Sequence, residues 1–331
     1  SNCRGAVFFM PEESSSPLAD AAILARGILM GAADIVPGVS GGTVALLLGI
    51  YPRLLSAISN VDGKLFRLVG KGAWREAARH LDLRFLVSLA VGIVAGVLAL
   101  SGVIHFLLED HRQLTMAAFF GLILASSFLV ARMSQPRGTS QTVLCLAQGL
   151  IAVPAAAWLV SGDHLDPMPG LPYVFLCGAI AICAMILPGI SGAYLLVLLS
   201  KYEDIIGILH RLKAGEATSN DLATLAVFAA GCAIGLLLFS KVLKALLAKF
   251  HSETMATLAG FMAGSLWKIW PFQLSRVPGA PIDKHSITDP VWPTEWTSEV
   301  AQCVGAAIAA FVLVIVVDAV ARKLKTDTQT T

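Results

Sequence analysis

Pro37-Gly38-Val39-Ser40-Gly41-Gly42 interrupts one long apolar stretch, at residues 21–58, and Pro188-Gly189-Ile190-Ser191-Gly192-Ala193 interrupts another, at residues 172–209. Each arm beside a break has roughly 16 residues, or about 24 Å as a helix, which is short of the ~30 Å hydrocarbon core of a bilayer. Irregular backbone at membrane depth is tolerated only where protein or a water-filled cavity satisfies its polar groups. We therefore expect re-entrant hairpins or broken helices whose Pro-Gly-x-Ser-Gly tips are buried near the midplane.

The two breaks belong to an internal repeat. A shift of 151 positions brings the first break onto the second, and the matched pairs include Gly27 with Gly178, Pro37 with Pro188, Ser40 with Ser191, Gly41 with Gly192 and Tyr51 with Tyr202. After a shorter second loop the shift becomes 139, and it matches Gly92 with Gly231, Gly96 with Gly235, Gly121 with Gly260 and Ser126 with Ser265. Chance similarity between apolar helices rarely aligns glycines and polar residues, so the sequence predicts a duplicated unit.

Charged residues are scarce, since they make up 14% of the 331 residues, while 56% are hydrophobic and the mean hydropathy is +0.76. Soluble proteins carry about 25% charged residues. The composition therefore argues against a disordered chain, a nucleic-acid binder and a soluble enzyme. Because charge is diluted along the whole chain, the sequence predicts a polytopic membrane protein.

Six further apolar segments reach, or nearly reach, the length of a membrane-spanning helix, at residues 85–108, 114–131, 142–160, 222–247, 254–270 and 300–320. Together with the two interrupted stretches they define repeat 1, residues 20–161, and repeat 2, residues 172–325. Residues 1–19 are taken as a tail outside the fold, whose beginning resembles a cloning remnant. The expected fold is an all-α polytopic membrane protein, in which each repeat has one hairpin and three transmembrane helices.

The distribution of basic residues predicts the topology. Residues 59–81 carry five cations against two acids, so this segment is expected on the cytoplasmic side. The same reasoning places both termini in the cytoplasm and the loop at residues 271–298 outside. Three full spans per repeat is an odd number, so the two repeats are expected to have inverted topology, as in many secondary transporters.

A substrate site is expected where the two tips meet. A helix restarts after each break, and its free N–H groups with the positive end of the helix dipole favour an anion. Hydroxyl groups and one cation complete the residues expected to bind a phosphate, which are Arg26, Gly38, Ser40, Gly41, Gly42, Thr43, Gly189, Ser191, Gly192 and Tyr194. The alternative is that proline and glycine only kink two packed helices.

Charges inside apolar segments are expensive and usually functional. Arg26 and Asp34 lie eight positions apart on the first arm. Arg26 could pair with a phosphate or extend to the membrane interface, and Asp34 could pair with Arg26 or bind a coupling proton or sodium ion. Glu203, after the second break, is a further candidate for ion coupling.

Several chemistries have no signature in the sequence. There is no P-loop, no GxSxG or HExxH motif and no pair of catalytic carboxylates, and the six cysteines lack metal-ligand spacing. We therefore expect no catalytic residue, no metal and no cofactor other than a possible coupling proton or sodium ion.

The run from Arg26 through Asp34-Ile35-Val36-Pro37-Gly38-Val39-Ser40-Gly41-Gly42-Thr43 to Tyr51 resembles a bacterial membrane family, and so does Met185-Ile186-Leu187-Pro188-Gly189-Ile190-Ser191-Gly192 followed by Tyr202-Glu203. This is the family of PopT-type polyprenyl-phosphate transporters, formerly a domain of unknown function, and the resemblance covers residues 20–325. Many relatives have lysine where this chain has Arg26, which preserves the charge but not the planar geometry of the group.

The resemblance implies a lipid substrate, undecaprenyl phosphate or a related polyprenyl phosphate. It implies return of this carrier from the outer to the inner leaflet of the bacterial cytoplasmic membrane for cell-envelope synthesis, with no nucleic acid as partner. The alternative from the residues alone is a secondary transporter of a small soluble anion. A membrane enzyme acting on lipid phosphate is a third class, which the missing acid–base residues disfavour.

Overall fold

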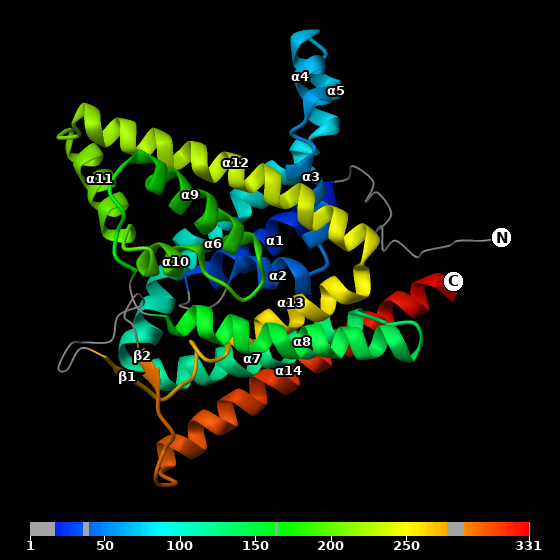
Figure 1. Cartoon of the computed structure of the whole chain (residues 1–331). Helices are drawn as coiled ribbons and strands as arrows, with labels where there is room; N and C mark the ends of the chain where they lie inside the picture. Colours follow the sequence, from blue (N-terminus) through cyan, green and yellow to red (C-terminus); the bar gives the residue numbers. More distant parts are fainter. Residues whose placement is uncertain (1–16, 36–39, 163–164, 277–287, 331) are drawn as a thin grey trace.

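The computed structural model describes residues 17–35, 40–162, 165–276 and 288–330 of the chain. Within these ranges it is an assembly of α-helices with one small two-stranded antiparallel sheet (Figure 1). In chain order the elements are α1 (Pro17–Asp34), α2 (Gly41–Leu47), α3 (Tyr51–Ser59), α4 (Gly63–Gly70), α5 (Trp74–His80), α6 (Leu83–Asp110), α7 (Arg112–Met133), α8 (Gly138–Ser161), α9 (Leu171–Ile186), α10 (Gly192–Leu198), α11 (Tyr202–Ala214), α12 (Ser219–Lys249), α13 (His251–Ser265), β1 (Gln273–Ser275), β2 (Thr288–Pro290) and α14 (Ser298–Thr330).

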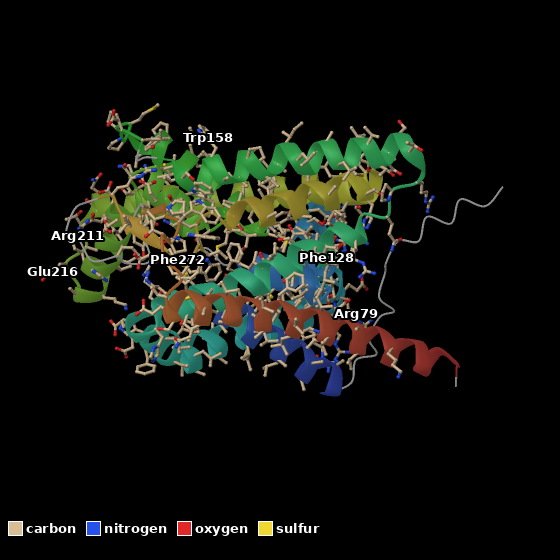
Figure 2. All side chains as sticks on the ribbon, turned by 90° about the horizontal axis from the view of Figure 1, so that it is seen from below. Arg79, Phe128, Trp158, Arg211, Glu216 and Phe272 are labelled. Atoms are coloured by element: carbon tan, nitrogen blue, oxygen red, sulfur yellow. The ribbon has the colours of Figure 1, made fainter. Side chains whose placement is uncertain are left out.

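Five helices are long and apolar enough to cross a membrane, namely α6, α7, α8, α12 and the part of α14 up to Val320. Their outer faces expose large apolar side chains, such as Leu98 on α6 and Trp158 on α8, which are 74% and 76% exposed. Figure 2 shows Trp158 on the outer side of α8. Apolar surface of this extent is stable when it contacts lipid, and the chain is a multi-pass membrane protein, as the composition predicted.

The first interrupted stretch folds as α1, α2 and α3, and both of its ends lie at the start of α6. Near the beginning of α1, Arg84 Nε of α6 donates to Asp20 Oδ2 at 2.8 Å. In α3, Arg53 Nε donates to Asp82 Oδ2, also at the start of α6, at 2.7 Å. Between these points α2 and α3 meet at a bend of 116°. The chain therefore enters beside the first turn of α6 and returns to it.

The second interrupted stretch, α9 to α11, is arranged in the same way around α12. Helix α9 packs along α12, and Arg211 Nε at the end of α11 donates to Asp221 Oδ2 in the first turn of α12 at 3.1 Å. In Figure 1, α2 and α10 lie in the interior, between α9 and α12 on one side and α7, α8 and α14 on the other. The structure thus has a broken element in each half of the chain.

Matched glycines allow matched helix pairs to approach closely. A Cβ at Gly27 of α1 would lie 2.9 Å from the Cα of Gly92 in α6, and one at Gly178 of α9 would overlap the carbonyl oxygen of Phe228 in α12. A Cβ at Gly121 of α7 would overlap α14, and one at Gly260 of α13 would lie 2.5 Å from the Gly149 carbonyl of α8. The glycines that define the repeat are therefore the positions at which helix backbones touch.

The stretch at residues 254–270, predicted as a span, is not one continuous α-helix in the structure. Helix α13 ends at Ser265, and its 15 residues cover about 22 Å, which is less than the ~30 Å hydrocarbon core of a bilayer. From Leu266 to Ile269 the chain continues in tighter turns, in which each N–H bonds to the carbonyl three residues earlier. The stretch is apolar because α13 is largely buried between α7 and α8, and not because it faces lipid along its whole length.

Two other regions contain structure that the sequence reasoning did not anticipate. The basic segment at residues 59–81 forms the short helices α4 and α5, and the loop at residues 271–298 contains the hairpin of β1 and β2. Helices α4 and α5 have 8 and 7 residues, and each strand has 3. These elements are shorter than the window of about 11–18 residues over which hydrophobic periodicity is read.

Candidate functional site

The two tips meet in the centre of the molecule. The backbone N–H of Gly189 donates to Thr43 Oγ1 at 2.9 Å, and this bond joins residues 146 positions apart in a fully buried setting. The Tyr51 hydroxyl donates to the Ile186 carbonyl at 2.9 Å. Side chains of the first broken element therefore bind the backbone of the second broken element directly.

The first turn of α2 is held by acceptors from its own repeat. Ser40, in extended conformation, accepts a hydrogen bond from the Gly42 N–H at 3.2 Å, and Asp34 Oδ1 accepts one from the Gly41 N–H at 2.6 Å. The Thr43 N–H donates to the Ser40 carbonyl at 2.9 Å. A carboxylate thus stands where the sequence reasoning expected an anionic substrate, and three N–H groups of α2 are bonded to protein in this conformation.

The first turn of α10 repeats the serine cap, and no hydrogen bond to a carboxylate is present there among the described residues. Ser191 Oγ accepts a hydrogen bond from the Tyr194 N–H at 3.4 Å, and the Tyr194 hydroxyl donates to the Val160 carbonyl in α8 at 2.8 Å. Gly189 has φ +90°, a left-handed conformation that favours glycine. A Cβ at Gly192 would overlap the Ala181 carbonyl, so this position requires glycine because the backbones of α9 and α10 touch.

Lys268 is a residue of this region that the sequence reasoning missed. Its Nζ lies 4.3 Å from the centroid of the Tyr194 ring, within the range of a cation–π interaction. The positively charged side chains of Arg112 and Arg276 lie near enough to repel the ammonium group of Lys268. The signal was present in the sequence, because Lys268 is a single lysine inside the apolar stretch 254–270.

Arg276 connects this region to the β-hairpin. Its guanidinium binds the Asp289 carboxylate, with Nη2 to Oδ1 at 2.7 Å, and lowers the pKa of Asp289 below its ordinary value. Arg276 Nη2 also donates to the Ser161 carbonyl at the end of α8, at 3.2 Å. The hairpin of β1 and β2 is therefore fastened to α8 close to the region of Lys268.

The remaining expected site residues are placed less centrally. Arg26 is half-buried on α1, eight residues before Asp34, which corresponds to about 12 Å along the helix axis. Asp34 itself is exposed, and Glu203 is exposed in the first turn of α11. Gly38 lies outside the described residues.

The residues that the structure describes contain no candidate metal site. No group of three or more histidine, cysteine, aspartate or glutamate side chains within these residues could hold a metal ion. The described residues of the tips bring together hydroxyl groups, backbone N–H groups, the carboxylate of Asp34 and the ammonium group of Lys268.

Known proteins resemble this chain over most of its length. A family model described as VCA0040-like: Undecaprenyl phosphate translocase-like matches residues 30–283. The chain is 37% identical over 248 residues to a protein of Vibrio cholerae named Polyprenyl-phosphate transporter, covering 75% of this chain and 77% of the relative. It is 29% identical over 258 residues to a protein of Staphylococcus aureus with the same name, covering 74% and 84%. No solved structure matches significantly. The region matched by the family model includes both tips.

Proposed function

Because the chain belongs to the undecaprenyl phosphate translocase-like family, we propose that it transports undecaprenyl phosphate or a related polyprenyl phosphate from the outer to the inner leaflet of the bacterial cytoplasmic membrane. The multi-pass architecture and the transporter names of two relatives support a transporter rather than an enzyme. Return of the carrier lipid to the inner leaflet would serve cell-envelope synthesis.

The proposal includes two repeats of inverted topology. Lys244, in the last turns of α12, donates from Nζ to Ser59 Oγ at 3.1 Å, and the neighbouring Asn60 binds the carbonyl of His80, just before α6. These bonds support an arrangement in which the end of α12 and the start of α6 lie on the same side of the membrane. Helices α6 and α12, which match each other in the repeat, would then cross the membrane in opposite directions. That side carries the basic segment 59–81 and is assigned to the cytoplasm.

The single observation that carries the transport mechanism is the direct bond between the two tips, from Gly189 to Thr43. Gly31 of α1 lies against Ile93 of α6, so the end of α1 is level with the middle of a helix that crosses the bilayer. Contacts between repeats at mid-depth can break and re-form as the repeats rock, which is the geometry of alternating access.

Two cations on opposite sides of the tips suit a phosphate that changes leaflets. Lys268 contacts Tyr194, whose hydroxyl binds the last turn of α8 on the external side, whereas Arg26 lies on α1 between the tips and the cytoplasmic start of α6. In this mechanism the phosphate first meets Lys268, passes the tip residues Ser40, Thr43 and Ser191, and leaves near Arg26.

Asp34 provides a means of coupling transport to a proton. In this conformation its carboxylate accepts a hydrogen bond from the Gly41 N–H, a position that a phosphate oxygen could also occupy. Protonation removes the negative charge and weakens this bond. An Asp34 that is protonated when phosphate is bound, and ionised when phosphate has left, would link the two events. Glu203 and a sodium ion remain the alternative coupling group and ion.

The decisive experiment is transport by the purified protein in liposomes that contain labelled polyprenyl phosphate in one leaflet. We expect transfer of the label to the other leaflet in the presence of protein, and loss of most transfer in the Arg26→Gln and Lys268→Gln variants. Lys213→Gln is a matched control, because Lys213 is an exposed cation in the last turn of α11 and is not among the residues assigned to the phosphate path.

Two outcomes would contradict the proposal. Uptake of soluble phosphate without lipid transfer would favour a transporter of small anions, and release of phosphate from the lipid would indicate an enzyme. Transfer that is insensitive to a pH gradient and a sodium gradient would remove the coupling role of Asp34 but leave the transport function intact.

A further inference from the structure

Helices α4 and α5 form an arm that stands apart from the bundle. Figure 1 shows them projecting away from the other helices, in a direction crosswise to α12 and α14. They pack on each other, and α5 also contacts the start of α6. Within the described residues, α4 buries no side chain, and α5 buries only Ala77. The arm therefore contributes little to the core, and its shape needs another explanation.

The base of the arm is fixed at the first turn of the membrane-spanning helix α6. The membrane-spanning helix α6 begins at Leu83, directly after the arm. Asn60 Nδ2, before the arm, donates to the His80 carbonyl at its end at 2.8 Å, and Arg53 binds Asp82. A segment that leaves the end of a spanning helix crosswise to the bundle has the direction of a segment that lies along the membrane surface.

One side of α4 is more apolar than its packing requires. At about 100° per residue, Leu65, Phe66, Leu68 and Val69 occupy a continuous apolar arc of α4. Leu68 is half-buried and faces α5, but Phe66 is 68% exposed. Trp74, the first residue of α5, is 66% exposed. Large exposed aromatic side chains at the edge of a bilayer are typical of groups that enter the interfacial region.

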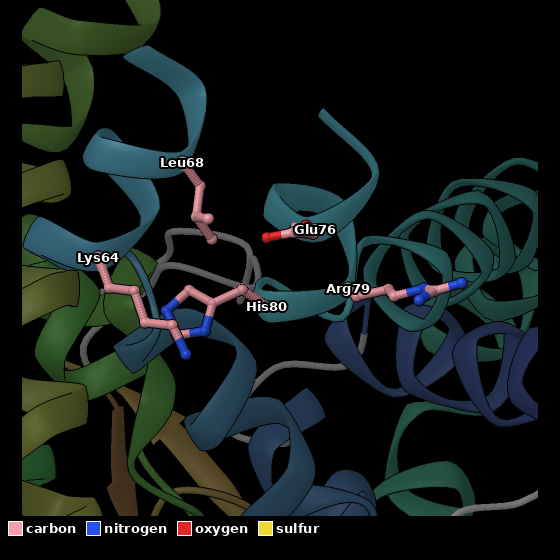
Figure 3. Close-up of a pocket in the computed structure, with 5 residues that line it drawn as sticks. All are labelled: Lys64, Leu68, Glu76, Arg79 and His80. Atoms are coloured by element: carbon pink, nitrogen blue, oxygen red, sulfur yellow. The ribbon is translucent and has the colours of Figure 1, made fainter. Parts of the chain in front are cut away.

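The rest of the arm is basic. Five exposed cations are present, Lys64, Arg67, Lys71, Arg75 and Arg79, against the exposed acid Glu76. Asp62 is engaged with the arm itself, since it caps α4 and its Oδ1 lies 3.0 Å from His80 Nε2. Lys64, Leu68, Glu76, Arg79 and His80 line an open hollow between the two helices. Figure 3 shows Lys64 and His80 converging at one side of this hollow.

We propose that α4 and α5 form an interfacial arm that binds the anionic phospholipid headgroups of the leaflet beside it, with Phe66 and Trp74 inserted among the acyl chains. Basic side chains near an anionic surface and apolar side chains below them are the two attractions that hold an amphipathic helix at a membrane. The inference depends on the membrane-spanning character of α6 and not on which substrate the protein transports.

The first test measures hydrogen–deuterium exchange of residues 63–80 in nanodiscs of phosphatidylcholine alone, and of phosphatidylcholine with an equal amount of phosphatidylglycerol. We expect slower exchange in the anionic nanodiscs. Each removed cation should weaken docking by about five-fold, so the double variant Arg67→Gln/Lys71→Gln should lose the difference. The double variant Lys213→Gln/Lys249→Gln, which removes two exposed cations elsewhere, should keep it. High salt should act like the first variant.

The second test needs no change of charge. Phe66 is replaced by p-benzoyl-L-phenylalanine, and the full-length protein is illuminated in native membranes. Covalent adducts with phospholipid are expected. Adducts with another protein or with a second copy of this chain, in place of lipid, would overturn the proposal, and so would exchange at residues 63–80 that is equal in the two kinds of nanodisc.

Discussion

The described parts of the two tips share a serine cap but differ in their charged residues. Ser40 and Ser191 cap α2 and α10 in the same extended conformation, and both tips rely on glycines that touch neighbouring groups. Asp34 binds the first tip, whereas the corresponding position of the second repeat is Met185. Lys268 lies at the second tip, and its counterpart in the first repeat is Leu129. The matched residues therefore belong to the common scaffold of the two broken elements, and the unmatched residues Asp34 and Lys268 have charges of opposite sign.

The largest expected difference between the tips concerns the glycines at their first helical positions. In Gly192→Ala the new Cβ would overlap the Ala181 backbone carbonyl, which cannot move without shifting α9. In Gly41→Ala the Cβ would meet the Asp34 carboxylate at 2.7 Å, which can rotate away. We expect a loss of stability of about 3 kcal/mol for Gly192→Ala and about 1 kcal/mol for Gly41→Ala.

Thermal unfolding of the detergent-solubilised variants measures this difference. Gly49→Ala is a useful control, since Gly49 has φ +72° but a Cβ placed there would have no atom within 4 Å, so this variant isolates backbone strain from contact. Equal destabilisation by Gly41→Ala and Gly192→Ala would show that the tips are packed alike.

The second largest effect on stability is expected from loss of the hydrogen bond between Gly189 and Thr43, which joins the tips. Thr43→Val preserves the shape of the side chain but removes the acceptor for the buried Gly189 N–H. An unsatisfied buried donor costs about 2 kcal/mol. Thr257→Val is the matched control for Thr43→Val, because the Thr257 hydroxyl donates to the Glu253 carbonyl within its own helix.

The measurement is again thermal unfolding, with lipid transfer as a second readout. Transport that is lost in Thr43→Val while stability matches that of Thr257→Val would assign the Thr43 hydroxyl to the substrate rather than to the contact between tips. Unchanged stability and unchanged transport in Thr43→Val would mean that the bond between the tips has no role.

A smaller effect is expected when the first tip is made to resemble the second. Asp34→Met copies the residue at position 185 and removes the carboxylate that binds the Gly41 N–H. Loss of a charge-assisted bond at a helix start costs about 1 kcal/mol. We expect slightly lower stability together with transport that no longer depends on a pH gradient. A pH dependence that survives Asp34→Met would direct attention to Glu203.

The comparison of the tips also explains what the sequence could and could not predict. The breaks, the helices around them and the matched glycines were predictable, because Pro-Gly segments and helix-contact glycines leave a local pattern. The contact between Thr43 and Gly189 depends on how two segments distant in sequence pack together. The sequence predicted only that both tips lie near the middle of the membrane, and not which atoms meet there. The carboxylate of Asp34 at the start of α2 was missed because the reasoning assumed free N–H groups. The end of α13 at Ser265 was missed because a buried helix and a lipid-facing helix have similar composition.

The smallest expected effect concerns the ion pair that fastens the β-hairpin beside the second tip. Arg276 lowers the pKa of Asp289, so the pair contributes stability above the ordinary value of 3.8 and loses it as the pH falls through the lowered pKa. The carboxylate is about half exposed, so the contribution should be about 0.5 kcal/mol. Asp289→Asn should therefore lower the stability slightly at neutral pH and not at all in strong acid.

The positive charge of Arg276 also repels the ammonium group of Lys268, so Asp289→Asn should alter lipid transfer more than it alters stability. The control is Asp20→Asn, which breaks an exposed ion pair between α1 and α6 and should not alter lipid transfer in this way. If Asp289→Asn and Asp20→Asn changed lipid transfer equally, the β-hairpin would have no specific influence on the second tip.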